Sequence, residues 1–524
     1  MGRMVRLMKR PESMLAAGVV GLAGALGVLV VVTLTSCESE SPGVKSARSG
    51  EGSVVRGAGK APRAADRFTG EPEMRVRILA GVESVKVGTG GGGMLLIWPG
   101  DPKGLTAAVG AGIEPTRVRG PATVRVSGVA GWTVQGAGSG AAEAKRFPTS
   151  AGLIIQGEEA GAGLTVNGVS YPGTLRLSAR TDVRDGAIDA VEFVRVEEYL
   201  PGVVAKEMLT GWPLGAYQAQ SVAARTYALQ ERQRSIDAGL AFDVESSDRD
   251  QVYGGATTNQ TAIQAVKSTR GQVLMDGDKL LRAYFSSTCG GRNASAKDTW
   301  PTGPGFEYNL AEPIQAHPRE SACERSPLYR WTVERPRAEL VARMRTFGEK
   351  NGLLIRKIKG LQAIEVMQVN VVGRPSRYKI IEPGGTWYQL SAEELRLACN
   401  TSVNAAAPAV GGTGGSAAKA PGKSAAPAQP LVMAVTPEAG GAGMVDDGGI
   451  AAPVAIPDVD RKTRVHSSDF EVQVVGERVI FTGRGFGHGV GLCQYCTKAW
   501  AERGEDWRVM MAKFYPGARI VSAY

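Results

Sequence analysis

The sequence of 524 residues has few histidines and lacks a phosphate-binding loop in a glycine-rich motif near its C-terminus. That motif, residues 481–496, reads FTGRGFGHGVGLCQYC and holds one of only three histidines. A dinucleotide fingerprint needs G-x-G-x-x-G, but Val490 stands where Gly485 and Gly487 require the third glycine. A Walker loop would need Gly-Lys-Ser/Thr, which this segment also lacks. Phosphate binding by the motif is therefore excluded.

Basic residues interleaved with aromatic ones are also missing, although the formal net charge is +10. Such clusters are typical of nucleic-acid-binding surfaces, so we expect no nucleic-acid partner. A scattered positive charge still attracts anionic surfaces and polymers. An acidic polymer of the cell envelope fits this pattern.

The N-terminal segment predicts export. Residues 1–10 are basic and residues 14–36 carry no charge, which is the pattern of a secretory signal. The apolar run ends in LTSC, which resembles a bacterial lipobox with Cys37 as the acylated residue. We predict an exported lipoprotein of the cell envelope, anchored to the membrane through Cys37. An uncleaved transmembrane anchor is the alternative.

The cysteine count does not fit a set of disulfides. Of six cysteines, Cys37 is assigned to the anchor, which leaves Cys289, Cys323, Cys399, Cys493 and Cys496. An odd number in an exported protein cannot pair completely. At least one thiol is free, or several are held by a metal such as zinc.

Composition also divides the chain. Residues 1–37 are the signal peptide, and residues 38–73, rich in Ser, Gly, Ala and Arg, predict a flexible linker. Residues 74–184 contain short alternating apolar runs between glycines, which predicts a β-rich part.

Residues 185–402 predict a mixed α+β core, and residues 403–460 a low-complexity, disordered insertion. Residues 461–524 are too few to fold alone, so we expect them to pack onto the segment before the insertion. The predicted fold class is α+β. The predicted elements are strands at 187–196 and 515–524, hairpins turning at Asp276-Gly277 and Gly476-Glu477, and helices at 213–237, 258–271, 490–503 and 506–514.

The pair Cys493 and Cys496 has three interpretations. A redox pair at a helix start would have a lowered thiol pKa, but no βαβ pattern surrounds it. Both cysteines are alternatively small buried hydrophobic residues. Third, Cys493 joins Cys289, Cys323 and His317 in a tetrahedral zinc site, although the spacing is not that of a zinc finger.

Glu207 is the carboxylate best suited to acid catalysis. It lies between a predicted strand and the helix at 213–237, with Met208 and Trp212 close by in the sequence. A carboxyl among apolar groups has a raised pKa, which suits a general acid at neutral pH. A solvated glutamate is the alternative.

Seven stretches in order resemble the stage II sporulation protein D (SpoIID) family, which includes the LytB amidase enhancer. They are EEYLPGVVAKEM, GWPLGAYQAQSVAARTYAL, DQVYGGA, AVKSTRGQVL, AYFSSTCGG, SPLYRW and GRGFGHGVGLCQY with the GEDWRVMMAKFYPGARI that follows it. The resemblance covers about residues 185–402 and 461–524.

The resemblance implies a lytic transglycosylase that acts on peptidoglycan, chiefly on glycan strands without stem peptides. Glu207 occupies the position of the family's catalytic glutamate. LytB-type relatives imply the alternative, a non-catalytic wall-binding protein that recruits or enhances an amidase. No organic cofactor is implied.

The resemblance also implies binding residues. Gln220, Arg225, Tyr253 and His488 lie in its motifs and are expected to bind substrate, although a structural role for His488 is the alternative. Some family members carry zinc, which implies Cys289, Cys323, Cys493 and His317 as ligands here. Phe285 departs from the family because many members have histidine at that position.

Overall fold

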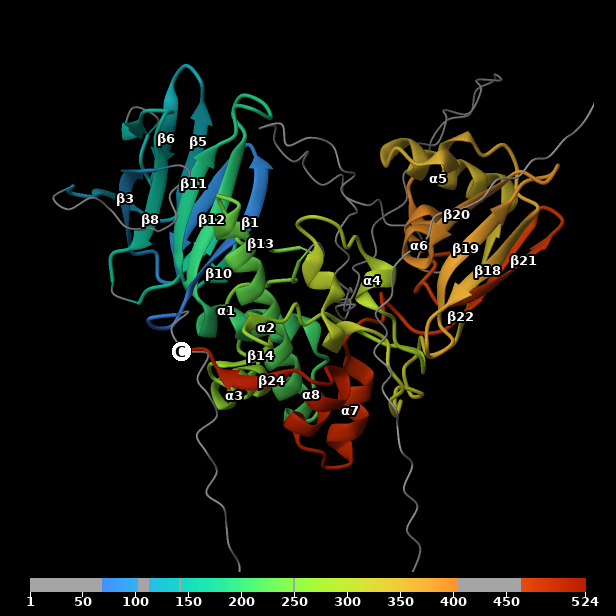
Figure 1. The fold of residues 1–524 in the computed structure, drawn as a ribbon. Helices are drawn as coiled ribbons and strands as arrows, with labels where there is room; N and C mark the ends of the chain where they lie inside the picture. Colours follow the sequence, from blue (N-terminus) through green and yellow to red (C-terminus); the bar gives the residue numbers. More distant parts are fainter. Residues whose placement is uncertain (1–67, 102–112, 141–142, 160, 248–249, 404–462) are drawn as a thin grey trace, which may run out of the picture. The chain divides into compact units, whose positions relative to one another are not determined.

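The structure is a computed structural model that describes residues 68–101, 113–140, 143–159, 161–247, 250–403 and 463–524 (Figure 1). Cys37, the signal segment, most of the predicted linker and nearly all of the low-complexity insertion lie outside the described residues. Within the described part of the chain, no helix has both the length and the hydrophobicity to cross a bilayer.

The N-terminal part is built from β-strands, as predicted. A seven-stranded sheet has the order β13-β1-β12-β11-β8-β3-β4, and a six-stranded sheet has the order β10-β9-β2-β5-β6-β7 (Figure 1). In β5, Ala122, Val124 and Val126 are buried and alternate with less buried residues, the period of a strand with one buried face. The strands are β1 (Glu73–Val82), β2 (Val85–Thr89), β3 (Met94–Gly100), β4 (Thr116–Arg119), β5 (Ala122–Ser127), β6 (Gly131–Gln135), β7 (Lys145–Phe147), β8 (Gly152–Gly157), β9 (Leu164–Val166), β10 (Val169–Tyr171), β11 (Thr174–Ala179), β12 (Ile188–Arg195) and β13 (Val244–Glu245).

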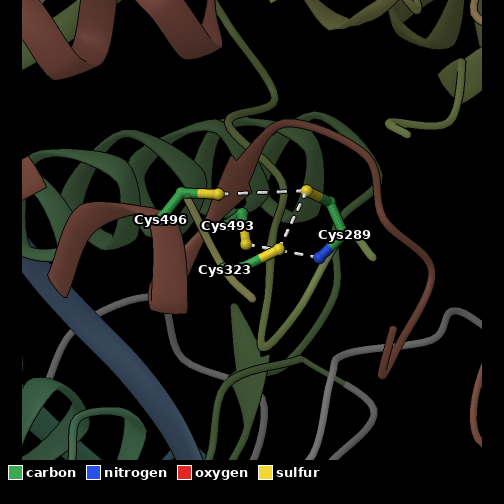
Figure 2. Close-up of side chains that lie close together, drawn as sticks. All are labelled: Cys289, Cys323, Cys493 and Cys496. Atoms are coloured by element: carbon green, nitrogen blue, oxygen red, sulfur yellow. Dashed lines mark hydrogen bonds between the residues drawn. The ribbon is translucent and has the colours of Figure 1, made fainter. Parts of the chain in front are cut away.

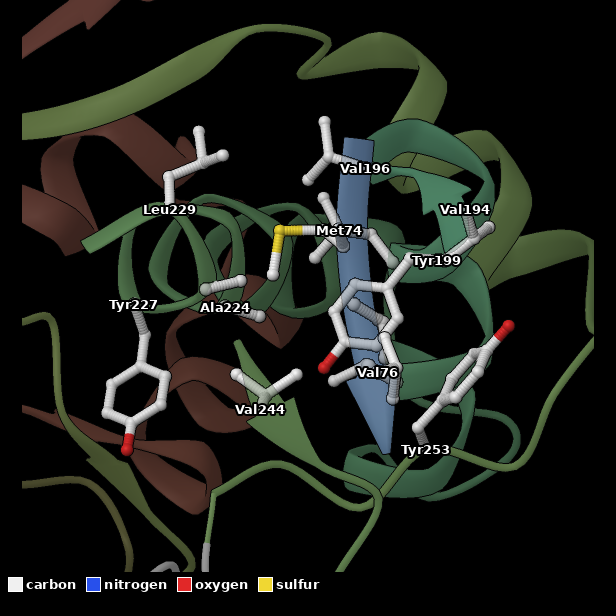
Figure 3. Packing of buried hydrophobic residues seen from close by; sticks show 14 of the residues in the cluster. Met74, Val76, Val194, Val196, Tyr199, Ala224, Tyr227, Leu229, Val244 and Tyr253 are labelled. Carbon is white, nitrogen blue, oxygen red and sulfur yellow. The ribbon is translucent and has the colours of Figure 1, made fainter. Parts of the chain in front are cut away.

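Helix α2 (Leu214–Asp237) is the centre of the larger hydrophobic core and confirms the predicted helix. Helices α1 (Val196–Glu207), α3 (Gln260–Ser268), α7 (Gln494–Glu502) and α8 (Trp507–Phe514) all pack against it. Figure 3 shows Met74 and Val76 of β1 beside Tyr199 of α1 and Ala224 of α2. Because neighbours surround α2, most of its residues are buried and it has no exposed polar face.

Helix α1 was not predicted. Pro201 lies inside it, and a proline inside a helix removes a backbone hydrogen bond, which makes a helix harder to recognise from the sequence. Burial of Tyr199, Leu200 and Val203 in the core outweighs this loss. Glu207 is consequently the last residue of a helix, not part of a loop.

The segment after the insertion returns to the core, as expected. Strand β24 (Arg519–Ser522) pairs with β14 (Gln272–Asp276), which also forms the predicted hairpin with β15 (Lys279–Leu280). Strand β23 (Leu492–Cys493) runs parallel to β16 (Phe285–Ser286). The same strand explains why α7 begins at Gln494, later than predicted.

A second hydrophobic core lies in residues 331–400 and 465–481. Its sheets have the orders β17-β22-β21 and β18-β19-β20 (Figure 1). None of its elements before residue 400 was predicted from the sequence, whereas the hairpin β21–β22 was. The elements are β17 (Trp331–Pro336), β18 (Ala363–Val369), β19 (Pro375–Ile381), β20 (Trp387–Ser391), β21 (Phe470–Val475), β22 (Arg478–Gly483), α5 (Arg337–Lys350), α6 (Ala392–Asn400) and the 3-10 turn at Leu354–Lys357. Short α4 (Ala296–Thr299) and 3-10 turns at Glu307–Leu310 and Glu312–Ile314 precede this core in the sequence. With sheets and helices in separate runs, the α+β class is confirmed.

Candidate functional site

Glu207 ends helix α1 with its side chain buried; only 2% of the residue is exposed. Burial raises the pKa of its carboxyl to about 8, because a charged carboxylate is poorly solvated there. Hydrogen bonds from the Gln494 side chain and the Val252 backbone act in the opposite direction and are smaller. The carboxyl is therefore mostly protonated at neutral pH.

A chain of two amides contacts this carboxyl. Gln494, the first residue of α7, donates from Nε2 to Glu207 Oε2 at 3.2 Å and to Gln220 Oε1 at 3.5 Å. Gln220 lies on α2 and is buried, and its Nε2 has no hydrogen-bond partner among the described residues. Glu207 was predicted from the sequence as the acid. Gln220 was predicted to bind substrate, but it is fully buried and contacts Gln494 instead, and Gln494 itself was missed. Its signal was its place in the quoted motif, between Cys493 and Cys496.

Four buried cysteines lie together next to this residue. Figure 2 shows Cys289, Cys323, Cys493 and Cys496, whose sulfurs all lie within 4.8 Å of one another. The Cys289 sulfur is 3.7 Å from that of Cys323 and 3.9 Å from that of Cys496. Parallel pairing of β16 with β23 brings the Cys289 segment beside Cys493, whose sulfur accepts the Cys289 backbone N–H at 3.2 Å.

The four sulfurs fit a tetrahedral zinc ion. Zinc–sulfur bonds of about 2.3 Å in a tetrahedron place sulfurs about 3.8 Å apart, close to the observed separations. A disulfide needs about 2.05 Å, and all five described cysteines are free. Because four protein ligands fill such a site, zinc here would stabilise the fold and leave no open position for substrate.

The predicted ligand set needs one correction. His317 is not in the cluster: its Nδ1 lies 3.1 Å from the Gln315 carbonyl and its Nε2 lies 2.9 Å from the Lys513 carbonyl. Cys496, for which no chemical role was expected, completes the group. Because Cys493 and Cys496 are three positions apart at the start of a helix, both reach the same point. Cys399 lies apart from them in the second core.

His488 is not available to a ligand. It is completely buried, with Nε2 3.0 Å from the Phe285 carbonyl and Nδ1 accepting the Val490 N–H at 3.0 Å. Burial lowers the pKa of this histidine to about 3, so the ring is neutral. The expectation that His488 binds substrate is thus wrong for this geometry, and its structural alternative holds.

The glycines around His488 have a packing role. Gly485, Gly487, Gly489 and Gly491 all have positive φ angles. A Cβ at Gly491 would come within 2.1 Å of the Tyr284 carbonyl. The motif is therefore a tight turn against neighbouring backbone.

Arg225 and Tyr253 also serve the packing. Arg225 is fully buried and forms a bidentate pair with Glu197 at 2.9 Å, which joins α2 to α1. Tyr253 packs against Tyr199 with ring centroids 4.8 Å apart. The predicted contact of these two side chains with substrate is not supported, because both are saturated or enclosed by protein.

The site therefore combines one protonated carboxyl with amide donors. After a proton leaves Glu207, the Gln494 amide hydrogen bonds to the charged form and stabilises it. A carboxyl with these properties can both donate and accept a proton near neutral pH.

Comparison with known proteins agrees with the motifs. Residues 184–275 match the family model described as "Stage II sporulation protein" (SpoIID). The chain is similar to an uncharacterized protein of Brachyspira hyodysenteriae, with 24% identity over 371 residues, 71% of this chain and 76% of the relative. Stage II sporulation protein D of Bacillus subtilis is 24% identical over 351 residues, 64% of this chain and 77% of the relative.

The amidase enhancer of Bacillus subtilis is 23% identical over 340 residues, 62% of this chain but only 40% of the enhancer. The matched segment 184–275 contains Glu207, Gln220 and Arg225. Residues 184–275 therefore match the SpoIID family model, and the chain is similar to proteins named stage II sporulation protein D and amidase enhancer.

Proposed function

We propose that this protein is a peptidoglycan lytic transglycosylase with Glu207 as its single acid and base. The observation that carries the proposal is the buried Glu207 carboxyl, whose pKa burial raises to about 8. Such a group holds a proton at the pH of the cell envelope and can give it to a substrate. The membership of residues 184–275 in the SpoIID family supports a substrate in the cell wall.

The proposed reaction needs one carboxyl. Glu207 gives its proton to the glycosidic oxygen, and the bond from that oxygen to the anomeric carbon breaks. The 6-hydroxyl of the same sugar attacks the anomeric carbon, and the Glu207 carboxylate takes the hydroxyl proton. The product is a 1,6-anhydro sugar end, and the enzyme returns to its starting state.

An intramolecular nucleophile makes a second carboxylate unnecessary. Ordinary glycosidases use two carboxyls because they must activate water or form a covalent intermediate. Here the attacking hydroxyl is already held next to the anomeric carbon, which gives it a high effective concentration. The Gln494 amide would stabilise the Glu207 carboxylate between the two proton transfers, and Gln220 Oε1 accepts from the same Gln494 amide.

A wall-binding amidase enhancer is the second candidate. It is favoured by the similarity of 62% of this chain to a protein named amidase enhancer. In that case the protein would bind glycan and increase the activity of a separate amidase without breaking the strand itself.

Digestion of peptide-free glycan strands, followed by mass spectrometry, distinguishes the two. The wild-type protein should release fragments with 1,6-anhydro ends, and Glu207→Gln should release none. Anhydro ends from the Glu207→Gln protein would refute the assignment of the acid. No new sugar ends from the wild type, together with faster cleavage by an added amidase, would establish the enhancer.

We also propose that the four cysteines hold a structural zinc ion. Their burial, their mutual distances and their thiol chemistry support it. Location in the cell envelope through a lipid on Cys37 remains part of the proposal. Labelling with a radioactive fatty acid, lost in Cys37→Ser, would test that anchor.

A further inference from the structure

Two aromatic side chains lie beside the candidate acid. Trp212 precedes α2 and Tyr495 is the second residue of α7, and their ring centroids are 4.9 Å apart in an edge-to-face arrangement. Both rings are partly exposed and pack against the larger core. Partly exposed aromatic residues are suited to contact a ligand.

Both rings lie close to Glu207 or to its hydrogen-bond partner Gln494 in the sequence. Tyr495 directly follows Gln494, whose side chain donates a hydrogen bond to the Glu207 carboxyl. Trp212 follows Glu207 by five residues, in the connection between α1 and α2. The two rings are therefore linked to the candidate acid through Gln494 and through the connection between α1 and α2.

The protein holds the pair in position without a ligand. The backbone N–H of Trp212 donates to the Leu209 carbonyl at 3.3 Å, and the Tyr217 hydroxyl donates to the same carbonyl at 3.0 Å. The Tyr495 N–H donates to the Ser287 carbonyl at 3.1 Å. Fixed backbone lowers the ordering cost of binding.

The polar atoms of both rings are free. Among the described residues, neither the Trp212 indole N–H nor the Tyr495 hydroxyl has a hydrogen-bond partner within the protein. By contrast, the indole N–H groups of Trp132 and Trp331 donate to backbone carbonyls. The rings thus offer an apolar face for the C–H groups of a sugar and polar atoms for its hydroxyls.

The surroundings of the pair carry little charge. Residues 208–213 contain no charged side chain, and the first turns of α2 and α7 contain no acidic residue. A neutral sugar ring suits this surface better than a charged stem peptide, which would be expected to pair with opposite charges.

We propose that Trp212 and Tyr495 form a stacking subsite for an N-acetylated amino-sugar ring of a glycan strand, adjacent to Glu207. The proposal rests on the proposed function for its substrate class. It holds for the enzyme and for the wall-binding alternative, because both require glycan to occupy this surface.

Binding is measured in the Glu207→Gln background, so that turnover does not consume the ligand. The probes are a β-1,4-linked N-acetylglucosamine tetramer and peptide-free glycan strands, titrated by calorimetry. Trp212→Ala and Tyr495→Ala should each weaken binding about tenfold. Tyr495→Phe should lose less, because it keeps the ring and removes only the hydroxyl.

Trp387→Ala is the matched control, because Trp387 is 49% exposed on β20 of the second core. It should leave affinity unchanged. Trp212→Phe, which keeps a smaller ring, should give an intermediate affinity and guards against a folding defect in Trp212→Ala. Circular dichroism melting identifies such a defect.

Undiminished affinity in a folded Trp212→Ala protein would overturn the subsite, as would failure of both probes to bind the Glu207→Gln protein. If the wild type forms no anhydro ends but Trp212→Ala still loses glycan binding, the subsite stands. In that outcome only the proposed transglycosylase activity fails.

Discussion

At the scale of single residues, the Glu207 carboxyl owes its raised pKa to burial rather than to a neighbouring charge. The two contacts that oppose burial are a side-chain amide and a backbone N–H, both neutral. Neutral donors stabilise the carboxylate less than a positive charge would, so they leave the pKa of Glu207 raised. The group can therefore change its protonation state within one reaction.

This pKa predicts the pH dependence of activity. The active form carries a proton on Glu207, so kcat/KM for peptide-free glycan should fall as pH rises through about 8. Gln494→Met removes a donor that favours the charged form, so the fall should move to higher pH by about one unit. A fall at unchanged pH in Gln494→Met would contradict the assigned contact.

The same pKa predicts a pH-dependent stability. The native state binds a proton that the unfolded state releases between pH about 4.5 and about 8, so wild-type stability falls as pH rises through this window. Glu207→Gln cannot titrate, so its stability relative to wild type should rise across the window, by about 1.4 kcal/mol per pKa unit. Urea unfolding at several pH values measures the difference. Glu365→Gln, on the exposed part of β18, is the control for the substitution itself.

At the scale of elements, the start of α7 joins the cysteine cluster to the candidate acid. Cys493, Gln494 and Cys496 lie within four consecutive positions, so whatever holds the two sulfurs also sets the position of the Gln494 side chain. The cluster draws its other two cysteines from separate loops. Its stabilising effect should therefore extend to the acid site.

Metal analysis of the purified protein tests the cluster. We expect about one zinc per chain in the wild type, with most of it lost in Cys289→Ser and Cys496→Ser, since each variant removes one of four ligands. Cys399→Ala and His317→Ala should retain it, because both side chains lie outside the cluster. A chelator should lower the melting temperature of the wild type, Cys399→Ala and His317→Ala, but not that of Cys289→Ser or Cys496→Ser. Zinc loss in His317→Ala with retention in Cys496→Ser would reverse our ligand assignment.

Helix α1 depends on a close approach at Gly202. A Cβ there would lie 2.1 Å from the Gly255 carbonyl and 2.7 Å from the Tyr253 ring. Gly202→Ala should therefore destabilise the protein by about 1–3 kcal/mol through overpacking, although alanine normally stabilises a helix. Gly303→Ala is the control, because its Cβ would meet nothing within 4 Å. Denaturant unfolding of both variants measures the effect.

At the scale of the whole molecule, both cores combine segments from before and after the insertion. The larger core needs β23, β24, α7 and α8, and the second core needs β21 and β22. A chain that ends at residue 403 should consequently lose cooperative unfolding in both cores. Hydrogen exchange should show weak protection in β14 and β17, whose partner strands are removed. Strong protection of α2 in that truncated chain would show that the larger core forms without the C-terminal segment.

Local patterns predicted much of this fold. Alternating apolar residues predicted the strands of the N-terminal part, and Asp276-Gly277 predicted the turn between β14 and β15. The length and spacing of apolar residues predicted α2. These features depend on neighbours in the sequence, which is why they could be read without a structure.

The site was only partly predictable, because its parts meet through pairing that no local pattern records. Chemistry and family motifs pointed to Glu207 and Gln220, while the role of Gln494 depends on a contact 287 positions away. His488 and Arg225 have residue types typical of binding sites, but burial against carbonyl groups and Glu197 decides their role. His317 was predicted as a zinc ligand and Cys496 was not, whereas the structure places Cys496 in the cluster and His317 outside it. Distance along the chain does not give distance in space.

The sequence by itself determined the similarity to the SpoIID family, the α+β class and the candidate acid, since these depend on residue types, their order and their local spacing. Only the tertiary structure decided which cysteines form one cluster and which side chains surround the acid. The physical reason is burial: the packing of α1, α2 and α7 removes Glu207 from water and places Gln494 against it. The contact between Gln494 and Glu207 joins positions 287 residues apart, which no local pattern records.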